Sequence, residues 1–301
     1  SSADMSAARS PMVTSVGESE LTLFGEPEPA TSFPLSIGRT RVEDRPSNSI
    51  LTRASGFMSD FDYTLNPYSG CSFGCTYCYA AFFSRDTELQ RTWGEWVHAK
   101  TNALQTLRRM RTDLRGKTVY MSSVTDPYQS VERRLELVRE LLPELARRGA
   151  RLVVQTRSPL VTRDIDLFGE FDAIRVNMTV TTDDDDVQRA FEPHCPTNRK
   201  RLDAIATVAA AGIDCRITLT PLLPIVDPVR FADQLLQTGV KHFVVQPFHA
   251  TKGRFVAGTR EQALSIVDQL NWSDDSYRKV VEILREKLPH LDEGRDGFQP
   301  V

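Results

Sequence analysis

Three cysteines, Cys71, Cys75 and Cys78, lie in one short stretch of the chain at a C-x3-C-x2-C spacing, although the whole chain has only five cysteines. Cysteine thiolates are the usual ligands of iron–sulfur clusters, so a tight loop with three of them can hold three irons of a cubane cluster. The fourth iron would then be open to a ligand that is not part of the protein. Gly70 and Gly74 lie beside these cysteines and allow backbone conformations that other residues avoid. This stretch therefore predicts a 4Fe–4S site.

Other interpretations of these cysteines are a structural zinc site, a disulfide or chance clustering. A structural zinc ion normally has four protein ligands, and no fourth cysteine or histidine lies in this neighbourhood. The remaining thiols, Cys195 and Cys215, are 20 residues apart and neither belongs to a C-x2-C pair, so we expect a single cluster. Cys215 alternates with Ile213 and Ile217, which predicts a small buried side chain. Cys195 lies in a turn before a helix, where a structural role is the simpler interpretation.

The composition favours an intracellular enzyme. The chain of 301 residues has 40 acidic and 37 basic residues and a net charge of −3, which does not indicate a strong electrostatic footprint for nucleic acid, although a local groove could still be basic. No apolar run approaches the roughly 20 residues of a membrane span, and the first residues lack the apolar region of a signal peptide. Clustered reduced thiols also point to the cytoplasm.

Alternating strands and helices follow the cysteine stretch. The patterns predict strands over residues 63–66, 118–122, 151–156, 174–181, 214–220 and 241–246. They predict helices over residues 79–84, 93–111, 132–148, 163–168, 198–211 and 228–237. Such alternation is typical of a parallel α/β architecture, and right-handed crossovers make a barrel or a barrel segment the natural arrangement. Catalytic residues in such barrels lie at the C-terminal ends of the strands.

The two ends of the chain differ from this central region. Residues 1–49 are rich in Ser, Pro and Glu, and we expect an irregular N-terminal extension, with a lid over the site as its functional alternative. Residues 50–250 would form the barrel. Residues 251–301 would form a C-terminal helical cap with helices over 258–270 and 276–288, and the tail from Pro289 would cap the barrel or fray.

Four separate motifs together resemble the radical S-adenosylmethionine (radical SAM) superfamily, and within it the spore-photoproduct-lyase-like branch. They are Asn66–Ala80, Thr125–Gln129, Thr156–Asp164 and Glu192–Leu202, and the resemblance covers roughly residues 51–248. It implies a partial (β/α)6 TIM-type barrel and a 4Fe–4S cluster whose open iron binds the amino and carboxylate groups of SAM. It also implies cleavage of SAM to methionine and a 5′-deoxyadenosyl radical.

The resemblance also implies contacts to the amino acid part of SAM. Thr125 and Asp126 would contact the amino group, Arg157 would pair with the carboxylate where relatives usually have Lys, and Thr179 would offer a hydroxyl where Ser is usual. Each has a plainer interpretation. Ser, Thr, Asp and Pro after a strand are ordinary turn residues, Arg157 could be a solvated cation at a strand end, and Thr179 could be an ordinary strand threonine.

Contacts to the adenine follow from the same resemblance. Tyr77 would lie near the adenine, as would backbone groups of Val245 and Gln246 on the sixth strand. One position departs from the lyase pattern, because Ser123 stands where spore photoproduct lyases have the cysteine that donates hydrogen. A serine O–H bond is far stronger than a thiol S–H bond, so Ser123 cannot replace that donor. This departure counts against repair of a thymine dimer.

These observations predict a radical SAM enzyme that abstracts hydrogen from a small-molecule substrate, such as a natural-product intermediate. Its electrons would come from an external donor such as flavodoxin or ferredoxin, and the sequence identifies no catalytic residue beyond the cofactor contacts. The first alternative is a radical SAM lyase or modifying enzyme that acts on nucleic acid. The second is a non-catalytic iron–sulfur redox sensor.

Overall fold

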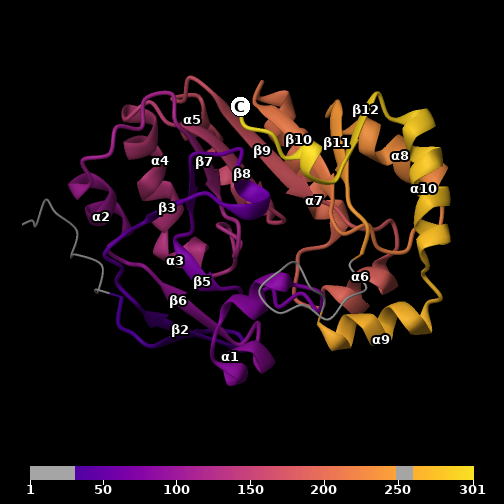
Figure 1. Ribbon diagram of the computed structural model, residues 1–301, viewed down its shortest axis with the longest axis horizontal. Helices are drawn as coiled ribbons and strands as arrows, with labels where there is room; N and C mark the ends of the chain where they lie inside the picture. Colours follow the sequence, from indigo (N-terminus) through magenta and orange to yellow (C-terminus); the bar gives the residue numbers. More distant parts are fainter. Residues whose placement is uncertain (1–30, 249–259) are drawn as a thin grey trace, which may run out of the picture. The chain divides into compact units, whose positions relative to one another are not determined.

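An eight-stranded sheet is the framework of the protein in the computed structural model, which describes residues 31–248 and 260–301 (Figure 1). Neighbouring strands are parallel throughout, except that the edge strand β3 runs antiparallel to β4. In spatial order the strands are β12 (His290–Glu293), β11 (His242–Val245), β10 (Asp214–Leu219), β9 (Ile174–Thr179), β8 (Arg151–Thr156), β7 (Thr118–Met121), β4 (Tyr63–Leu65) and β3 (Leu51–Arg53). All six predicted strands are present, and β12 adds a seventh parallel strand.

Helices cover one face of this sheet. They are α2 (Ala103–Arg109), α4 (Leu137–Arg147), α5 (Ile165–Phe168), α7 (Asn198–Ala210), α8 (Pro228–Gln237) and α10 (Asp274–Lys287). Alternate strand residues such as Val119, Val154 and Ile217 pack against this helical layer in the main hydrophobic core. This is the period-two pattern of a strand with a different environment on each face. In α4, Leu141 and Leu145 are buried one turn apart, as expected for an amphipathic helix.

The other face of the sheet is closed at its N-terminal end by the end of the chain. Tyr120, Val153 and Val244 form a small apolar cluster there with Phe61 and Phe298. Arginines at the starts of three neighbouring strands donate to backbone carbonyls of the tail: Arg151 to Val301, Arg175 to Gln299 and Arg216 to Gly297. The tail therefore caps this end of the sheet, and the C-terminal ends of the strands remain for the site.

A second sheet of four strands supports the cysteine loop. Its order is β1 (Leu35–Ile37), β2 (Thr40–Asp44), β6 (Trp96–Ala99) and β5 (Tyr68–Gly70). The expectation of an irregular segment was therefore wrong for residues 35–44, while the first 30 residues of that segment lie outside the described residues. Strand β2 pairs with β6, and the paired residues are 55 positions apart in the chain. A local pattern cannot show such pairing.

Two predicted helices are interrupted. The segment 93–111 contains strand β6 and the short helix α2, because Val97 and Ala99 are buried on one side of a strand while Trp96 and His98 are half-buried on the other. The segment 132–148 is divided into α3 (Glu132–Leu135) and α4 by Glu136, whose φ of 54° is in the left-handed region. The local apolar spacing was compatible with helix in both cases.

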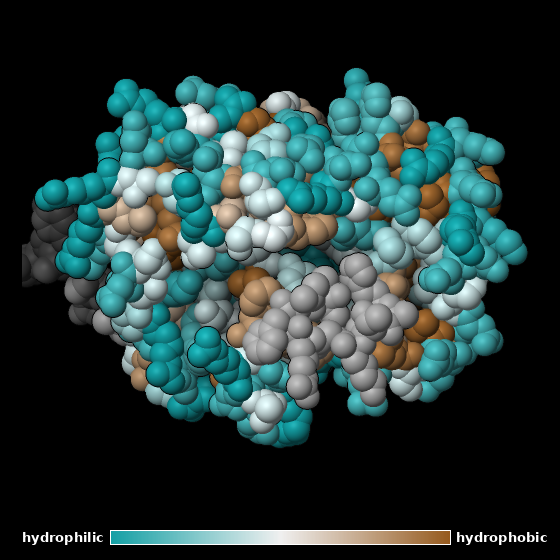
Figure 2. All heavy atoms as spheres, in the orientation of Figure 1, coloured by the Kyte–Doolittle hydropathy of each residue, from teal (hydrophilic) through white to brown (hydrophobic). Residues whose placement is uncertain are grey.

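Shorter helical elements complete the fold. They are η1 (Gly56–Met58), η2 (Tyr79–Phe83), α1 (Thr87–Arg91), η3 (Pro159–Asp164), α6 (Asp185–Phe191), α9 (Glu261–Gln269) and η4 (Gly294–Gly297). Hydrophilic residues cover most of the face seen in Figure 2, and hydrophobic residues form small separate patches on it. No helix within the described ranges combines the length and the apolar character that a membrane crossing requires.

Candidate active site

The cysteine loop begins directly after β5, and its two glycines are required by its geometry. Gly70 and Gly74 have φ values of +78° and +55°, which L side chains rarely adopt. A Cβ atom at Gly70 would lie 2.6 Å from the carbonyl oxygen of Trp96, and one at Gly74 would lie 3.0 Å from Cα of Gly94. The loop is therefore pressed against β6 and the turn that precedes it.

The segment Thr125–Gln129 fastens this loop to the end of β7. The Thr125 hydroxyl donates to the carbonyl oxygen of Gly70 at 2.6 Å, and Gln129 Oε1 accepts from the backbone N–H of Ser72 at 2.8 Å. Gln129 Nε2 in turn donates to the Thr125 hydroxyl at 2.9 Å. Thr125 thus lies beside the cysteine loop, and its hydroxyl is already engaged with the loop backbone.

The cysteine sulfurs lie in an apolar environment. Cys71, Cys75 and Cys78 share one hydrophobic cluster with Tyr77, and Cys195 packs against it. Burial raises the pKa of Cys78 to about 11 and that of Cys71 well above its ordinary value. The pKa of Cys75 is lowered by its hydrogen bond with Cys195 and by the nearby positive charge of Arg157. Metal binding to Cys71 and Cys78 would therefore release protons.

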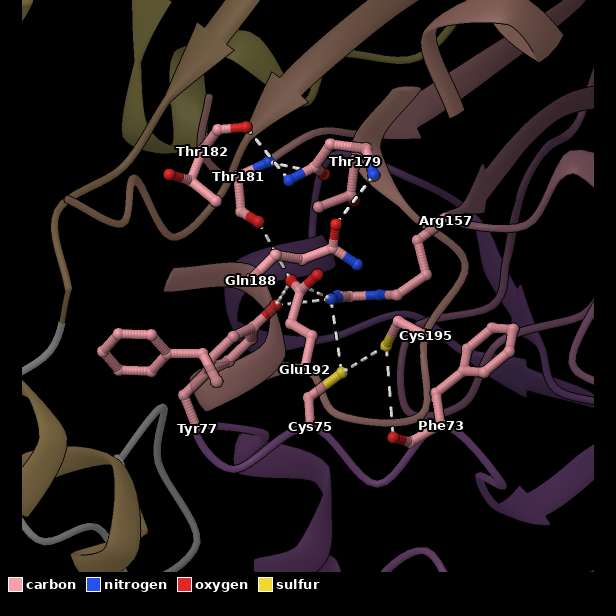
Figure 3. A network of polar contacts seen from close by, with 12 residues as sticks. Phe73, Cys75, Tyr77, Arg157, Thr179, Thr181, Thr182, Gln188, Glu192 and Cys195 are labelled. Atoms are coloured by element: carbon pink, nitrogen blue, oxygen red, sulfur yellow. Dashed lines mark hydrogen bonds and ion pairs between the residues drawn. The ribbon is translucent and has the colours of Figure 1, made fainter. Parts of the chain in front are cut away.

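Arg157 follows β8 and lies between the cysteine loop and Glu192 (Figure 3). Its Nη1 atom lies 3.3 Å from Cys75 Sγ and 3.0 Å from Glu192 Oε1, and it also contacts the Tyr77 hydroxyl. Its Nε and Nη2 atoms have no hydrogen-bond partner in the part of the chain that the structure describes. The side chain is 18% exposed. The Nε and Nη2 atoms form the edge of the guanidinium group that can donate two parallel hydrogen bonds to one carboxylate.

Glu192 lies just after α6, and its side chain is fully buried among donors. Its Oε1 atom accepts from Arg157, from the Tyr77 hydroxyl and from the Thr181 hydroxyl at 3.1 Å, and its Oε2 atom accepts from Arg201. Burial alone would raise the pKa of Glu192, but the charges of Arg201 and Arg157 outweigh it and lower that pKa. Glu192 is therefore held as a carboxylate.

Asp126 connects the end of β7 to the end of β8. Its Oδ1 atom accepts from the Thr156 hydroxyl at 2.7 Å and from the Tyr128 N–H at 2.9 Å, and its Oδ2 atom accepts from the Arg157 N–H at 2.9 Å. Burial raises the pKa of Asp126 and outweighs these hydrogen bonds. Asp126 thus positions the backbone of Arg157, and the chain already uses three of the roughly four acceptor positions of a carboxylate.

The other predicted contacts lie at the ends of neighbouring strands. Thr179 is the last residue of β9, and its side chain lies on the face of the sheet opposite the helical layer. Its hydroxyl accepts from Gln155 Nε2 at 2.8 Å and forms a hydrogen bond with the Thr218 hydroxyl at 3.0 Å. Val245 ends β11, and its side chain belongs to the helix-facing core. Gln246 follows Val245, and the Gln246 backbone forms hydrogen bonds with the backbones of Leu219 and Leu222. The structure therefore joins Cys75, Tyr77 and Arg157 directly, but not Thr179, Val245 or Gln246 to them.

Three residues of the site were not singled out from the sequence as site residues. Glu192 and Arg201 lie inside a motif that was quoted only for its resemblance, and their presence together in that motif was the available signal. Cys195 was given a structural interpretation, yet its sulfur lies 3.4 Å from Cys75 Sγ. Because 120 residues separate these cysteines in the chain, spacing alone could not show their contact.

The donor set suits an iron–sulfur cluster better than a single ion. Within the described ranges, no three His, Cys, Asp or Glu side chains converge on a point that could hold one metal ion. A cubane cluster instead uses its three thiolates on three separate irons. The buried Ser72 hydroxyl, between the first two cysteines, also has no hydrogen-bond partner among the described residues. A hydroxyl in this position fits a site whose occupant has sulfur atoms that accept hydrogen bonds.

Comparisons with known proteins agree with this geometry. The family model of the Radical SAM superfamily matches residues 65–234, which is more than half of the chain. An uncharacterized protein of Mycobacterium tuberculosis (strain H37Rv) is 31% identical over 257 residues, which cover 77% of this chain and 74% of that protein. An uncharacterized protein of Methanocaldococcus jannaschii is 36% identical over 162 residues. That match covers 54% of this chain and 61% of the M. jannaschii protein, less than two thirds of it.

Solved structures show the same fold. Spore photoproduct lyase complexed with dinucleoside spore photoproduct matches with a TM-score of 0.56 at 14% identity, over 84% of this chain and 81% of that chain. A double mutant of the lyase, with bound AdoMet and dinucleoside spore photoproduct, matches with a TM-score of 0.55 at 15% identity over the same shares. The predicted α/β fold with a partial TIM-type barrel is therefore confirmed.

Proposed function

Because the chain belongs to the radical SAM superfamily and is an enzyme of that class, we propose that Cys71, Cys75 and Cys78 hold one 4Fe–4S cluster that binds SAM. When bound, the cluster supplies the electron that cleaves SAM to methionine and a 5′-deoxyadenosyl radical. The observation that carries the proposal is the unused edge of Arg157 beside the cysteine loop. A single cluster is supported by the position of Cys215, whose thiol lies in the helix-facing core and donates to the carbonyl oxygen of Ile213.

The chain would orient SAM through residues at the strand ends. Arg157 would pair with the SAM carboxylate through Nε and Nη2, and Tyr77 would lie near the adenine with backbone groups of Val245 and Gln246. Thr125 and Asp126 would face the amino group, and Thr179 would face the amino acid part of SAM. The aromatic packing of Tyr77 on Phe248, with ring centroids 6.3 Å apart, supports an apolar wall that excludes water from this side.

We propose a small molecule as the substrate from which the radical abstracts hydrogen, and an external electron donor such as flavodoxin or ferredoxin. Two observations support a small molecule over nucleic acid. The net charge is −3, and the hydroxyl of Ser123 is engaged with Asn66 Nδ2 at 3.3 Å and has no thiol chemistry. Binding of DNA or RNA that weakens steeply with salt would instead support a nucleic-acid substrate.

The proposed chemistry is tested with anaerobically reconstituted protein. We expect about four irons per chain for one cubane cluster and, after reduction, formation of 5′-deoxyadenosine and methionine from SAM, both measured by chromatography. Cys78→Ala should lose the cluster and the cleavage, while Cys215→Ala, which lies in the core, should keep both. Full SAM turnover by the Cys78→Ala variant would contradict the assignment, and cluster binding without any SAM cleavage would support an iron–sulfur sensor.

A further inference from the structure

Glu192 is the buried acid that contacts the guanidinium group of Arg157 within the described residues, and it is itself held in place by Arg201. The side chains of Glu192 and Arg201 are both fully buried. Arg201, on α7, also donates through Nε to the carbonyl oxygen of Pro196 at 2.9 Å and through Nη1 to that of Thr179 at 3.3 Å. These backbone contacts fix the guanidinium group of Arg201, and the fixed guanidinium group in turn fixes the Glu192 carboxylate.

Glu192 contacts Arg157 on only one side of its guanidinium group. The contact uses Nη1 of Arg157, the same atom that lies 3.3 Å from Cys75 Sγ. A guanidinium group is planar, so holding Nη1 in place sets the direction of the Nε and Nη2 edge as well. Glu192, which Arg201 holds in place, therefore helps to set where the free edge of Arg157 points, together with the contacts of Nη1 to Cys75 and Tyr77.

The charge of this group also favours an anionic ligand. Glu192 contributes one negative charge, while Arg157 and Arg201 contribute two positive charges, and Arg157 also lies 3.3 Å from Cys75 Sγ. A ligand carboxylate would pair with the edge of Arg157 that faces neither Glu192 nor Cys75, and charge-assisted hydrogen bonds of this kind are strong. Arg157 is the arginine available to such a ligand, because Arg201 has no exposed surface.

We propose that Glu192 is a positioning residue that orients Arg157 toward the carboxylate of SAM. This inference rests on the proposed function and adds to it a residue that does not touch SAM. It predicts that the charge of Glu192 matters as well as its shape. A carboxylate only accepts hydrogen bonds, and every partner of Glu192 is placed to donate. A glutamine has an NH2 group in place of one carboxylate oxygen, so in either orientation of its amide an N–H group would face one of these donors.

The test measures SAM binding by calorimetry with the oxidised, cluster-loaded protein, which does not cleave SAM without a reductant. We expect Glu192→Gln to raise the Kd of SAM about tenfold or more, as for the loss of one charge-assisted contact. In an Arg157→Ala background, the same change should alter the Kd less than about twofold, because contributions that act through one residue are not additive. The thermodynamic cycle separates positioning of Arg157 from a general loss of structure.

Glu132→Gln is the matched control. Glu132 is also fully buried and accepts from an arginine, Arg163, and from a tyrosine hydroxyl, that of Tyr68. None of its contacts involves Arg157 or a cysteine. Glu132→Gln should therefore leave the Kd of SAM unchanged. If Glu192→Gln fails to fold, the charge-balanced variant Glu192→Gln/Arg201→Gln should show the same rise in Kd, with iron content and cluster absorbance as checks of integrity.

The outcomes separate this inference from the proposed function. Absence of SAM binding by the unmodified protein would contradict the proposed function, and this inference with it. Unchanged SAM binding in a cluster-loaded Glu192→Gln variant would overturn only the positioning role. Tighter binding would overturn it too, because it would mean that Glu192 competes with the SAM carboxylate for Arg157. Equal effects of Glu192→Gln with and without Arg157 would also contradict it.

Discussion

Two buried networks in this protein are built from the same side chains, a glutamate, an arginine and a tyrosine. In the first, Glu132 accepts from Arg163 and from the Tyr68 hydroxyl. Arg163 uses all three of its nitrogen atoms, because Nε and Nη2 also donate to Asp164 and Nη1 donates to the backbone of Glu132. Asp164 is paired again with Arg139. Every nitrogen atom of the Arg163 guanidinium group therefore has a partner within the chain.

In the second network, Glu192 accepts from Arg157 and from the Tyr77 hydroxyl. The exposed fractions do not distinguish the two networks, since the Arg157 side chain is 18% exposed and the Arg163 side chain is 19% exposed. The networks differ in the number of carboxylates that the arginine side chain contacts. The Arg163 guanidinium group forms ion pairs with two carboxylates, whereas that of Arg157 forms one, with a carboxylate that Arg201 also contacts.

The two networks show that buried ion pairs made of the same types of side chain can have different roles. A network in which every arginine nitrogen has a partner within the chain fastens elements together, here β5, α3 and η3. A network in which the arginine has an unused donor edge has a position for a ligand. The cysteine loop lies beside the second network only, through the contact between Arg157 and Cys75. Incomplete pairing, more than burial, therefore marks the site.

The largest expected contrast comes from truncating the two arginines. Arg157→Ala should raise the Kd of SAM roughly tenfold to a hundredfold, since one charge-assisted contact contributes about 1.5–3 kcal/mol. Its stability should change little, because Glu192 remains paired with Arg201. Arg163→Ala should instead lower the free energy of unfolding by about 3–5 kcal/mol, because it leaves the buried Glu132 carboxylate without its cationic partner.

Calorimetric SAM binding and urea unfolding of both variants check this contrast. The cluster absorbance of each variant serves as a control that the cysteine loop is intact. The distinction between the two networks fails if Arg163→Ala weakens SAM binding in a folded protein as much as Arg157→Ala does.

A smaller contrast is expected in the pH dependence of stability. Burial raises the pKa of Glu132 above its ordinary value of 4.5, with hydrogen bonds from Arg163 and Tyr68 offsetting part of the effect. A carboxyl group with a raised pKa stabilises the fold below its unfolded pKa, and this contribution is lost as the pH rises through the folded pKa. The advantage of the unmodified protein over Glu132→Gln should therefore shrink as the pH rises above 4.5, by at most about 1.4 kcal/mol per pH unit, and should become constant once the pH exceeds the folded pKa.

Glu192 should behave differently in the same range. Its pKa lies below the ordinary value of 4.5, because Arg201 and Arg157 outweigh the effect of burial. Its contribution is present above the unfolded pKa and is lost only as the pH falls through the folded pKa. The advantage over Glu192→Gln should therefore stay constant from about pH 5 to 8. Urea unfolding at several pH values measures both, and parallel curves for the two variants would contradict the assignment.

The parts of the molecule that depend on local spacing were predictable from the sequence. The cysteine loop has its three thiols within eight residues, Cys71 to Cys78. The six central strands alternate with helical patterns along the chain, and Gly149 and Gly212 mark the ends of two of those helices. Strand β6 was missed, because the spacing of Val97 and Ala99 within a longer apolar pattern was compatible with a helix. Its pairing with β2 and β5 depends on residues far away in the chain.

The networks themselves could not be predicted from spacing. Glu192 and Arg157 are 35 residues apart, and Glu132 and Arg163 are 31 residues apart. The residues of both pairs lie at or near the ends of strands and helices that are distant in the sequence and adjacent in the folded protein. The sequence shows two similar sets of acidic and basic residues. Only the contacts show that one set is complete and the other is not.

The smallest contrast is expected from the two tyrosines. Each donates its hydroxyl to the glutamate of its network, Tyr68 to Glu132 and Tyr77 to Glu192. Tyr77 also accepts from Arg157, so Tyr77→Phe removes a support of the open network while it keeps the ring. We expect the Kd of SAM to rise about fivefold, as for the loss of about 1 kcal/mol from one hydrogen bond.

Tyr68→Phe should lower the free energy of unfolding by about 1 kcal/mol, because the buried carboxylate loses one donor, and it should leave the Kd of SAM unchanged. Calorimetry and urea unfolding on both variants give the comparison, and the edge contact of the Tyr77 ring with Phe248 is kept by phenylalanine. Equal effects of the two substitutions on SAM binding would mean that both networks act on the ligand. In that case the free edge of Arg157 would no longer identify the site.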